Sequence, residues 1–265
     1  MEVFDAVDAG TSLWLMGEPS ASYTAETVFG PLITLLERIG LPERVRFDRD
    51  PRFLGGTGMH DFPTPFLRFW YALGVQPIVN PPHRPDLNPV VERLHGTLER
   101  EYRQRILPGS LEATWESLPV FQQHYNTKRP HQGRSCRNQP PAVACPQLPL
   151  RPPLPARVDP DRWLEAYHGR CFARRVKGNG SVHLDEQPYY VGRSYAGHEV
   201  VARLDAPSRQ VLVLDSQQHL LAVKPMRGLV GAELSLEAFV VWCEKEARAR
   251  WRRYLSTDHH LRQAS

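Results

Sequence analysis

The chain has 265 residues, of which 41% are hydrophobic and 23% charged, so it can bury the core of one large domain or two ordinary ones. It contains no run of eighteen apolar residues, and its acidic N-terminal segment lacks the basic and then apolar pattern of a secretory signal. We therefore predict an intracellular protein with no membrane partner. The four cysteines have no C-x-x-C spacing, which argues against a cysteine-based zinc site.

The basic residues are distributed unevenly along the chain. Residues 1–150 hold 15 Lys and Arg against 16 Asp and Glu, whereas residues 151–265 hold 18 against 13. A near-neutral half beside a basic half favours a polyanionic partner for the second half, although a basic solvated surface would give the same count.

The first half has the pattern of an α/β domain. The apolar positions of residues 24–40 fall on one helical face, with Thr24 placed to cap the helix and Gly40 to end it. Asn88 is placed to cap a long helix that has Pro89 at its first position. The predicted elements are strands 3–7, 12–16, 44–47 and 75–79 and helices 24–40, 66–73, 88–106 and 111–125.

The second half begins with a change of composition. Residues 140–160 contain eight prolines, which predicts a stiff linker. Six short alternating segments then predict a small β-barrel, with a hairpin turn at 178–180, and residues 235–254 predict an amphipathic helix with a basic end. The predicted strands are 171–176, 181–184, 187–191, 199–204, 211–214 and 220–223.

Two acids stand in segments suited to phosphoryl-transfer chemistry. Asp48 ends a predicted strand in the segment FDRDPRF, and Glu92 lies in the first turn of the helix that follows PPHRPDLN. An acid at a strand end and an acid on a nearby helix can converge on divalent cations such as Mg²⁺. Asp50, in contrast, is predicted to be a turn residue.

These segments resemble the second and third acid blocks of DDE transposases with a retroviral-integrase-like catalytic core. Asp48 matches the Asp of D-N-G-x-x-F, and Glu92 matches the Glu of P-x-x-P-x-x-N-x-x-V-E-R. HYNTKRPHQG (124–133) and NQPPAVA (138–144) resemble the blocks that follow, so the resemblance covers about residues 1–145. It implies a ribonuclease H-like α/β core with a mixed five-stranded sheet, and it implies Asp48 and Glu92 as catalytic metal ligands.

The chain departs from the family pattern in three places. Arg49-Asp50 replaces Asn-Gly after Asp48, and the 43 residues between Asp48 and Glu92 exceed the usual spacing, which we attribute to a surface-loop insertion at 55–65. The family's first catalytic Asp lies on a strand that would precede Met1. We therefore expect a chain that lacks the first strand, its Asp and an N-terminal helix-turn-helix region, with Asp5 as a less favoured substitute ligand.

The resemblance also implies a domain order and its DNA contacts. We expect the catalytic core at 1–136, the linker at 137–157, a barrel that resembles the SH3-like domain of phage Mu-type transposases at 158–230, and a basic helix and tail at 231–265. The candidate DNA-binding residues could equally be surface or packing residues: they are Arg93, Arg129, Arg174, Arg175 and Lys177.

The predicted activity is DNA transposition and integration through Mg²⁺- or Mn²⁺-dependent hydrolysis and strand transfer, with two ions in the intact site. The expected partners are double-stranded DNA, at transposon ends and target, and further copies of the chain. The resemblance places it in the bacterial cytoplasm or nucleoid. Because the first Asp is missing, an alternative is a catalytically incomplete DNA-binding fragment or remnant; a repurposed nuclease of the same fold is less favoured.

Overall fold

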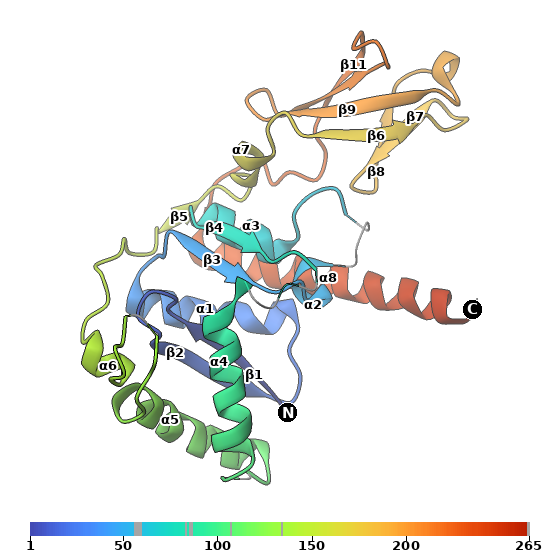
Figure 1. The fold of residues 1–265 in the computed structure, drawn as a ribbon. Coiled ribbons are helices and arrows are strands. Elements are labelled where there is room, and N and C mark those ends of the chain that lie inside the picture. Colours follow the sequence, from blue (N-terminus) through green and yellow to red (C-terminus); the bar gives the residue numbers. More distant parts are fainter. Residues whose placement is uncertain (56–59, 83, 85–86, 107, 134, 264–265) are drawn as a thin grey trace. The chain divides into compact units, whose positions relative to one another are not determined.

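The computed structural model describes residues 1–55, 60–82, 84, 87–106, 108–133 and 135–263, with the backbone alone for 257–263. The chain forms a mixed α/β structure and divides into two compact units (Figure 1). The first unit comprises residues 1–52 and 75–154, and the second comprises 53–74 and 155–265. Within the described part of the chain, every helix is too short or too polar to cross a membrane.

The first unit contains most of the elements predicted for the first half. Strand β3 has the predicted bounds, and α1 begins directly after Thr24 and ends before Gly40, as predicted. The elements of this unit are β1 (Glu2–Val7), β2 (Trp14–Ser20), α1 (Ala25–Ile39), β3 (Arg44–Phe47), β4 (Gln76–Val79), α4 (Pro89–Thr97), η2 (Leu98–Arg103), α5 (Leu111–Thr127) and α6 (Pro141–Ala144). A short helix, α2 (Pro51–Leu54), lies where the chain passes into the second unit.

The strands of the first unit differ from the predicted mixed sheet. Strand β1 pairs antiparallel with β2, and β3 pairs parallel with β4, as two separate two-stranded sheets. Because no strand in the described residues forms hydrogen bonds with both β1 and β3, the two pairs do not share one ladder. The predicted single sheet is therefore not formed by these four strands, although parallel and antiparallel pairing are both present.

The core of the first unit packs helices against β1 and β2. Trp14, on β2, is 1% exposed and lies edge-on to Phe121 and Tyr125 of α5. The helix predicted at 88–106 continues past α4 as a π-helix, η2, in which Tyr102 is buried and its hydroxyl lies 2.7 Å from Ser117 Oγ. A π-helix has i→i+5 hydrogen bonds in place of the i→i+4 bonds of an α-helix. The spacing of apolar residues in the sequence does not predict this switch.

The second unit holds the six predicted short strands and the predicted C-terminal helix. Its core is formed around Trp163, which is fully buried, by the inward residues of the strands together with Phe62. The elements are α3 (Pro65–Ala72), β5 (Arg157–Val158), α7 (Trp163–Tyr167), β6 (Cys171–Arg175), β7 (Ser181–Leu184), β8 (Gln187–Tyr190), η3 (Arg193–Tyr195), β9 (Glu199–Asp205), β10 (Gln210–Leu214), β11 (Leu220–Pro225), β12 (Leu234–Ser235) and α8 (Leu236–Gln263).

These strands do not form the predicted closed barrel. Four of them make an open antiparallel sheet in the order β11-β10-β9-β6, and β7 and β8 form a separate hairpin. A hydrogen-bonded turn lies at the predicted 178–180, where the Gly180 N–H donates to the Lys177 carbonyl over 2.8 Å and the Lys177 N–H donates to the Ser181 carbonyl over 2.9 Å. A second tight turn, at Asp185-Glu186, joins the paired strands β7 and β8, and both of its residues have positive φ. The strands on either side of 178–180, β6 and β7, belong to different sheets, so the described strands do not close around a barrel.

Residues 53–74 belong to the second unit, although we assigned them to the catalytic core from the sequence. Helix α3 packs against α8 and α7 there, and Phe62 lies 5.0 Å from Trp163 between ring centroids. Part of the predicted insertion at 55–65, namely 56–59, lies outside the described residues.

Candidate functional site

Asp48 follows β3 directly, at the edge of the parallel pair β3–β4. Phe47 is paired with Val79, so the residues after the two strands, Asp48 and Asn80, lie side by side. The buried Asn80 donates its Nδ2 hydrogen to Asp48 Oδ1 over 2.7 Å and accepts a hydrogen bond from Arg46 Nη1 over 2.9 Å. This chain of hydrogen bonds fixes the orientation of an exposed carboxylate.

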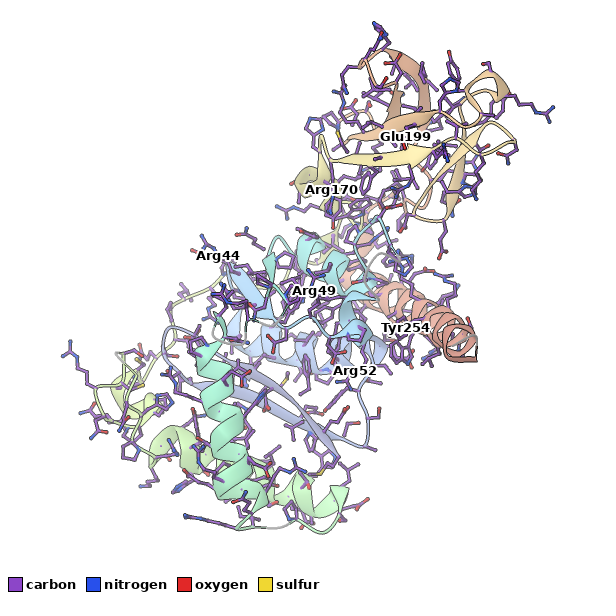
Figure 2. The ribbon with its side chains drawn as sticks, turned by 45° about the vertical axis from the view of Figure 1, so that its right-hand side comes forward. Arg44, Arg49, Arg52, Arg170, Glu199 and Tyr254 are labelled. Carbon is purple, nitrogen blue, oxygen red and sulfur yellow. The ribbon has the colours of Figure 1, made fainter. Side chains whose placement is uncertain are left out.

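The turn after Asp48 is held by a different acid. Asp50 pairs with the Arg52 guanidinium over 2.7 Å, and the same guanidinium reaches Glu2 over 2.7 Å. The backbone N–H of Tyr23 and the Arg52 guanidinium lower the pKa of Glu2. Arg49 and Arg52 are shown in Figure 2. Asp50 therefore has the turn role predicted for it, and its carboxylate is engaged by arginine.

Glu92 lies in the first turn of α4 and is exposed. Asn88 occupies the cap position that we predicted, but its side chain makes no capping hydrogen bond. One turn beyond Glu92, the half-exposed His95 places Nε2 3.5 Å from Asp5 Oδ2. The pKa of His95 is raised, chiefly by the hydrogen bond that its ring donates to Asp5 and then by the negative charges of Asp5, Glu92 and Asp48. His95 therefore lies within the field of all three acids.

Asp5 is brought to this position by packing of α4 against β1. Its side chain is only 4% exposed and accepts a hydrogen bond from Trp14 Nε1 over 3.0 Å. Burial raises the pKa of Asp5, against the lowering effect of His95. Asp5 and His95 line a pocket of about 220 Å³ together with residues of β1 and η2. The carboxylate is thus already partnered on both sides.

The described residues contain no group of three or more His, Cys, Asp or Glu side chains arranged to hold a metal ion. Asp48 and Glu92 share the neighbourhood of His95, but Asp5 faces Trp14 and His95. Of these three acids, Asp48 and Glu92 are exposed, whereas Asp5 is buried.

The predicted DNA-binding residues have different surroundings. Arg93, Arg175 and Lys177 are exposed. Arg129 instead forms a two-pronged ion pair with Glu101 of η2, at 2.8 and 3.1 Å. Arg174 pairs with Asp61, and its Nε donates to the carbonyl of His183. Arg129 and Arg174 therefore have intramolecular partners that the sequence did not indicate.

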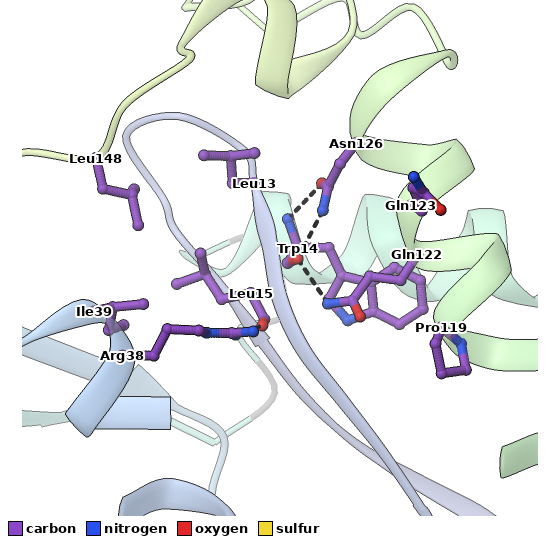
Figure 3. Close-up of a pocket in the computed structure, with 10 residues that line it drawn as sticks. All are labelled: Leu13, Trp14, Leu15, Arg38, Ile39, Pro119, Gln122, Gln123, Asn126 and Leu148. Atoms are coloured by element: carbon purple, nitrogen blue, oxygen red, sulfur yellow. Dashed lines mark hydrogen bonds between the residues drawn. The ribbon is translucent and has the colours of Figure 1, made fainter. Parts of the chain in front are cut away.

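The segment HYNTKRPHQG holds the end of α5 in place. Tyr125 is 1% exposed, and its hydroxyl lies 3.0 Å from Nε2 of the buried His131. Asn126 accepts a hydrogen bond from the backbone N–H of Trp14 and donates one to its carbonyl, each over 2.9 Å (Figure 3). The amide of Asn126 thus occupies the outer edge of β2 as a neighbouring strand would.

Two polar residues of the site were missed in the sequence. Asn80 could have been found, because the carboxyl ends of neighbouring parallel strands share one edge of a sheet and Asn80 follows β4 as Asp48 follows β3. The partnership of Arg46 with Asn80 had no local signal, because it depends on the register of the two strands.

The comparisons with known proteins concern the segment that carries Glu92. Residues 73–141 match the integrase core domain. This confirms the predicted resemblance for α4, η2 and α5, and it includes Glu92, Arg93 and Arg129, whereas Asp48 lies outside the matched segment. The predicted likeness of residues 158–230 to a Mu-type barrel is not confirmed.

The chain was also compared with curated proteins and with solved structures. No curated protein matches the chain. Among solved structures, the chain is similar to one in the cryoEM structure of the simian T-cell lymphotropic virus intasome in complex with PP2A regulatory subunit B56 gamma, with 14% sequence identity and a TM-score of 0.40 over 85% of this chain and 74% of that chain.

Proposed function

We propose that the chain is a transposase- or integrase-type protein of DNA transposition, and that Asp48 and Glu92 hold the divalent cations of its reaction site. The observation that carries the proposal is the match of residues 73–141 to the integrase core domain, because this segment contains Glu92 in the first turn of its helix. The electrostatic effect of both acids on His95 supports their convergence at one place.

The two acids have the chemistry that Mg²⁺ or Mn²⁺ requires. Both carboxylates are exposed, and Mg²⁺ is commonly bound by one or two carboxylates plus phosphate oxygens of the substrate. Bound ions would activate the attacking oxygen and stabilise the leaving oxygen of a phosphodiester. In this reaction Asn80 orients the Asp48 carboxylate, and Arg93, exposed next to Glu92, contacts a DNA phosphate.

The proposed domain order assigns the remaining parts of the chain to DNA binding and assembly. Residues 1–52 and 75–136 would form a ribonuclease H-like core, 137–157 the linker, 158–230 a DNA-binding domain with an open sheet, and 231–265 a basic tail. Arg175, the last residue of β6, and Lys177 are both exposed and would contact the DNA backbone. The affinity for DNA would therefore fall steeply as the salt concentration rises. Several copies would assemble on paired DNA ends.

Nicking of a supercoiled plasmid by the purified chain in Mg²⁺ or Mn²⁺ tests the proposal. Glu92→Gln removes a negative charge without changing the shape of the side chain, so nicking should fall by roughly a hundredfold or more. Glu99→Gln is the matched control, because Glu99 is an exposed acid seven residues further along that pairs with Arg103. Nicking that is equal in the wild type and Glu92→Gln would contradict the proposed role of Glu92.

A second candidate function is DNA binding without catalysis. It is favoured by the state of Asp5, whose buried carboxylate is engaged by Trp14 and His95 and so is not available as a third acidic ligand. Under this alternative, the wild type shows no metal-dependent nicking but retains salt-sensitive binding to duplex DNA, which Lys177→Gln weakens by about twofold to fivefold.

A further inference from the structure

The second unit contains a charged pocket that the proposed reaction site does not use. Its volume is about 370 Å³, and it is formed by the start and middle of α3, the β7–β8 turn, the 228–230 loop and the middle of α8. Its charged and titratable lining residues are His60, Arg68, Asp185, Glu186, Glu246, Arg250 and Arg253. Such a lining excludes a purely apolar ligand.

Arg68 lies in the wall of this pocket and is 3% exposed. Its guanidinium carbon lies 4.8 Å from the ring centroid of Trp163, and its Nε and Nη1 donate to the carbonyls of Pro63 and Gly228. Burial lowers the pKa of Arg68 to about 10, so the side chain is still charged at neutral pH. Within the described residues, no carboxylate forms an ion pair with it.

Arg250 contributes a second, largely covered guanidinium to the same pocket. Its side chain is 14% exposed, and its Nη2 lies 3.3 Å from Asp185 Oδ2. Its Nη1 is buried and has no hydrogen-bond partner among the described residues. A charged group left with an unpaired donor away from water is destabilising, so Arg250 gains from any additional anion that its guanidinium can reach.

The inner part of the pocket therefore has an excess of positive charge. Asp185 is the only carboxylate paired with Arg250 in the described chain, and it also accepts the backbone N–H of Phe62 over 3.3 Å. His60 lies 3.8 Å from Asp185, but burial and then the charge of Arg250 lower the pKa of His60, which favours its neutral form. Two guanidiniums thus face one inner carboxylate.

The remaining acids lie towards the rim. Glu186 is about half exposed and pairs with Arg253 over 4.0 Å. Glu246 lines the pocket one helical turn before Arg250 and is partly exposed. Glu246 is therefore the acid whose charge opposes the entry of an anion.

We propose that this pocket binds a phosphate group. Planar guanidiniums hold phosphate oxygens through paired, charge-assisted hydrogen bonds, and a phosphate supplies the negative charge that Arg68 and Arg250 lack. A cation would meet the two guanidiniums of Arg68 and Arg250, and a neutral ligand would leave their charge uncompensated. The site is separate from Asp48 and Glu92, and it requires neither metal nor catalysis.

Isothermal titration of the full chain with inorganic phosphate, at constant ionic strength, is the first test. The wild type should bind one phosphate, and Arg250→Gln should weaken this binding by about tenfold through loss of a charge-assisted contact. Arg252→Gln is the matched control: it is an exposed arginine on the same helix that does not line the pocket, and its binding should change by less than about twofold. No saturable binding by the wild type, or an equal loss in both variants, would overturn the proposal.

Glu246→Gln keeps the proposal testable even if Arg250→Gln fails to fold. Removal of this lining carboxylate should strengthen phosphate binding by about threefold or more, because it removes a like charge from the ligand's surroundings. Unchanged or weaker binding in this variant contradicts the proposed site, since loss of folding cannot produce a gain in affinity.

Two short oligonucleotides that differ only in a 5′-phosphate identify the source of the phosphate. Arg250-dependent preference for the phosphorylated one indicates a DNA-end monoester, and equal Arg250-dependent affinity indicates the phosphodiester backbone. Binding of inorganic phosphate alone indicates a free anion. Because the test requires no nicking, its result is independent of the plasmid assay with Glu92→Gln.

Discussion

Asn126→Ala should destabilise the first unit by removing the amide that holds the outer edge of β2. The backbone N–H of Trp14 would lose its acceptor, Asn126 Oδ1, and become an unsatisfied donor in a residue that is 1% exposed. The Trp14 carbonyl would keep one partner, because Gln122 Nε2 also donates to it over 2.8 Å. One unsatisfied donor and one lost hydrogen bond together cost about 2–3 kcal/mol.

Urea unfolding monitored by tryptophan fluorescence measures this loss, with hydrogen exchange at the Trp14 amide as a local readout. Gln123→Ala is the control, because the exposed side chain of Gln123 makes no hydrogen bond to β2 within the described residues, and its removal should change the stability by less than about 0.5 kcal/mol. Asn126→Asp, of nearly the same shape, should be at least as damaging at pH 7, since it places a carboxylate oxygen against the Trp14 carbonyl. A loss in Asn126→Ala no larger than that of the control would refute the reasoning.

Two further predictions concern β1 and β2. Gly17→Ala should cost about 1–3 kcal/mol in thermal or urea unfolding, because a Cβ would lie 2.5 Å from the Trp14 ring; an unchanged midpoint would show that the ring can move aside. Titration of His95 by NMR should give a pKa above 6.5 that falls in Asp5→Asn. Since the folded pKa is the higher one, the stability from this pair is fully present below pH 6.5 and is lost as the pH rises through the folded value. A His95 pKa at or below 6.5 would contradict the contact.

The sequence predicted the position of most elements because their side chains alternate or repeat clearly. Strands β3 and β7 have the predicted bounds, and α1 and α5 begin where capping residues stand. Pairing was predicted less well, since ladders depend on residues far apart in sequence. The closed barrel was inferred from strand count and the single mixed sheet from the family resemblance, and neither of these determines which edges pair.

The candidate DNA-binding arginines show a second limit of the sequence. Arg129 and Arg174 look like phosphate contacts in a basic segment, yet each is held by a carboxylate, Glu101 or Asp61, that lies far away in the chain. The side chain of Arg129 is about one quarter exposed and its guanidinium has two-pronged geometry, so it can position α5 against η2. Exposed Arg93, Arg175 and Lys177 are the better candidates to contact DNA.

The departure from Asn-Gly after Asp48 has a structural reason. An Asn-Gly pair suits a turn that requires left-handed backbone, but neither Arg49 nor Asp50 has positive φ among the described residues. The turn is closed instead by the Asp50 N–H, which donates to the Asp48 carbonyl over 2.9 Å, and by the Arg52 N–H, which donates to Asp50 Oδ1 over 2.8 Å. A carboxylate thus stabilises the turn that glycine would otherwise permit. Because Asp50 closes the turn through its side chain, Asp50→Gly should loosen both the turn and the orientation of Asp48. In an Asn-Gly turn, by contrast, glycine itself would be required, because it adopts positive φ without strain.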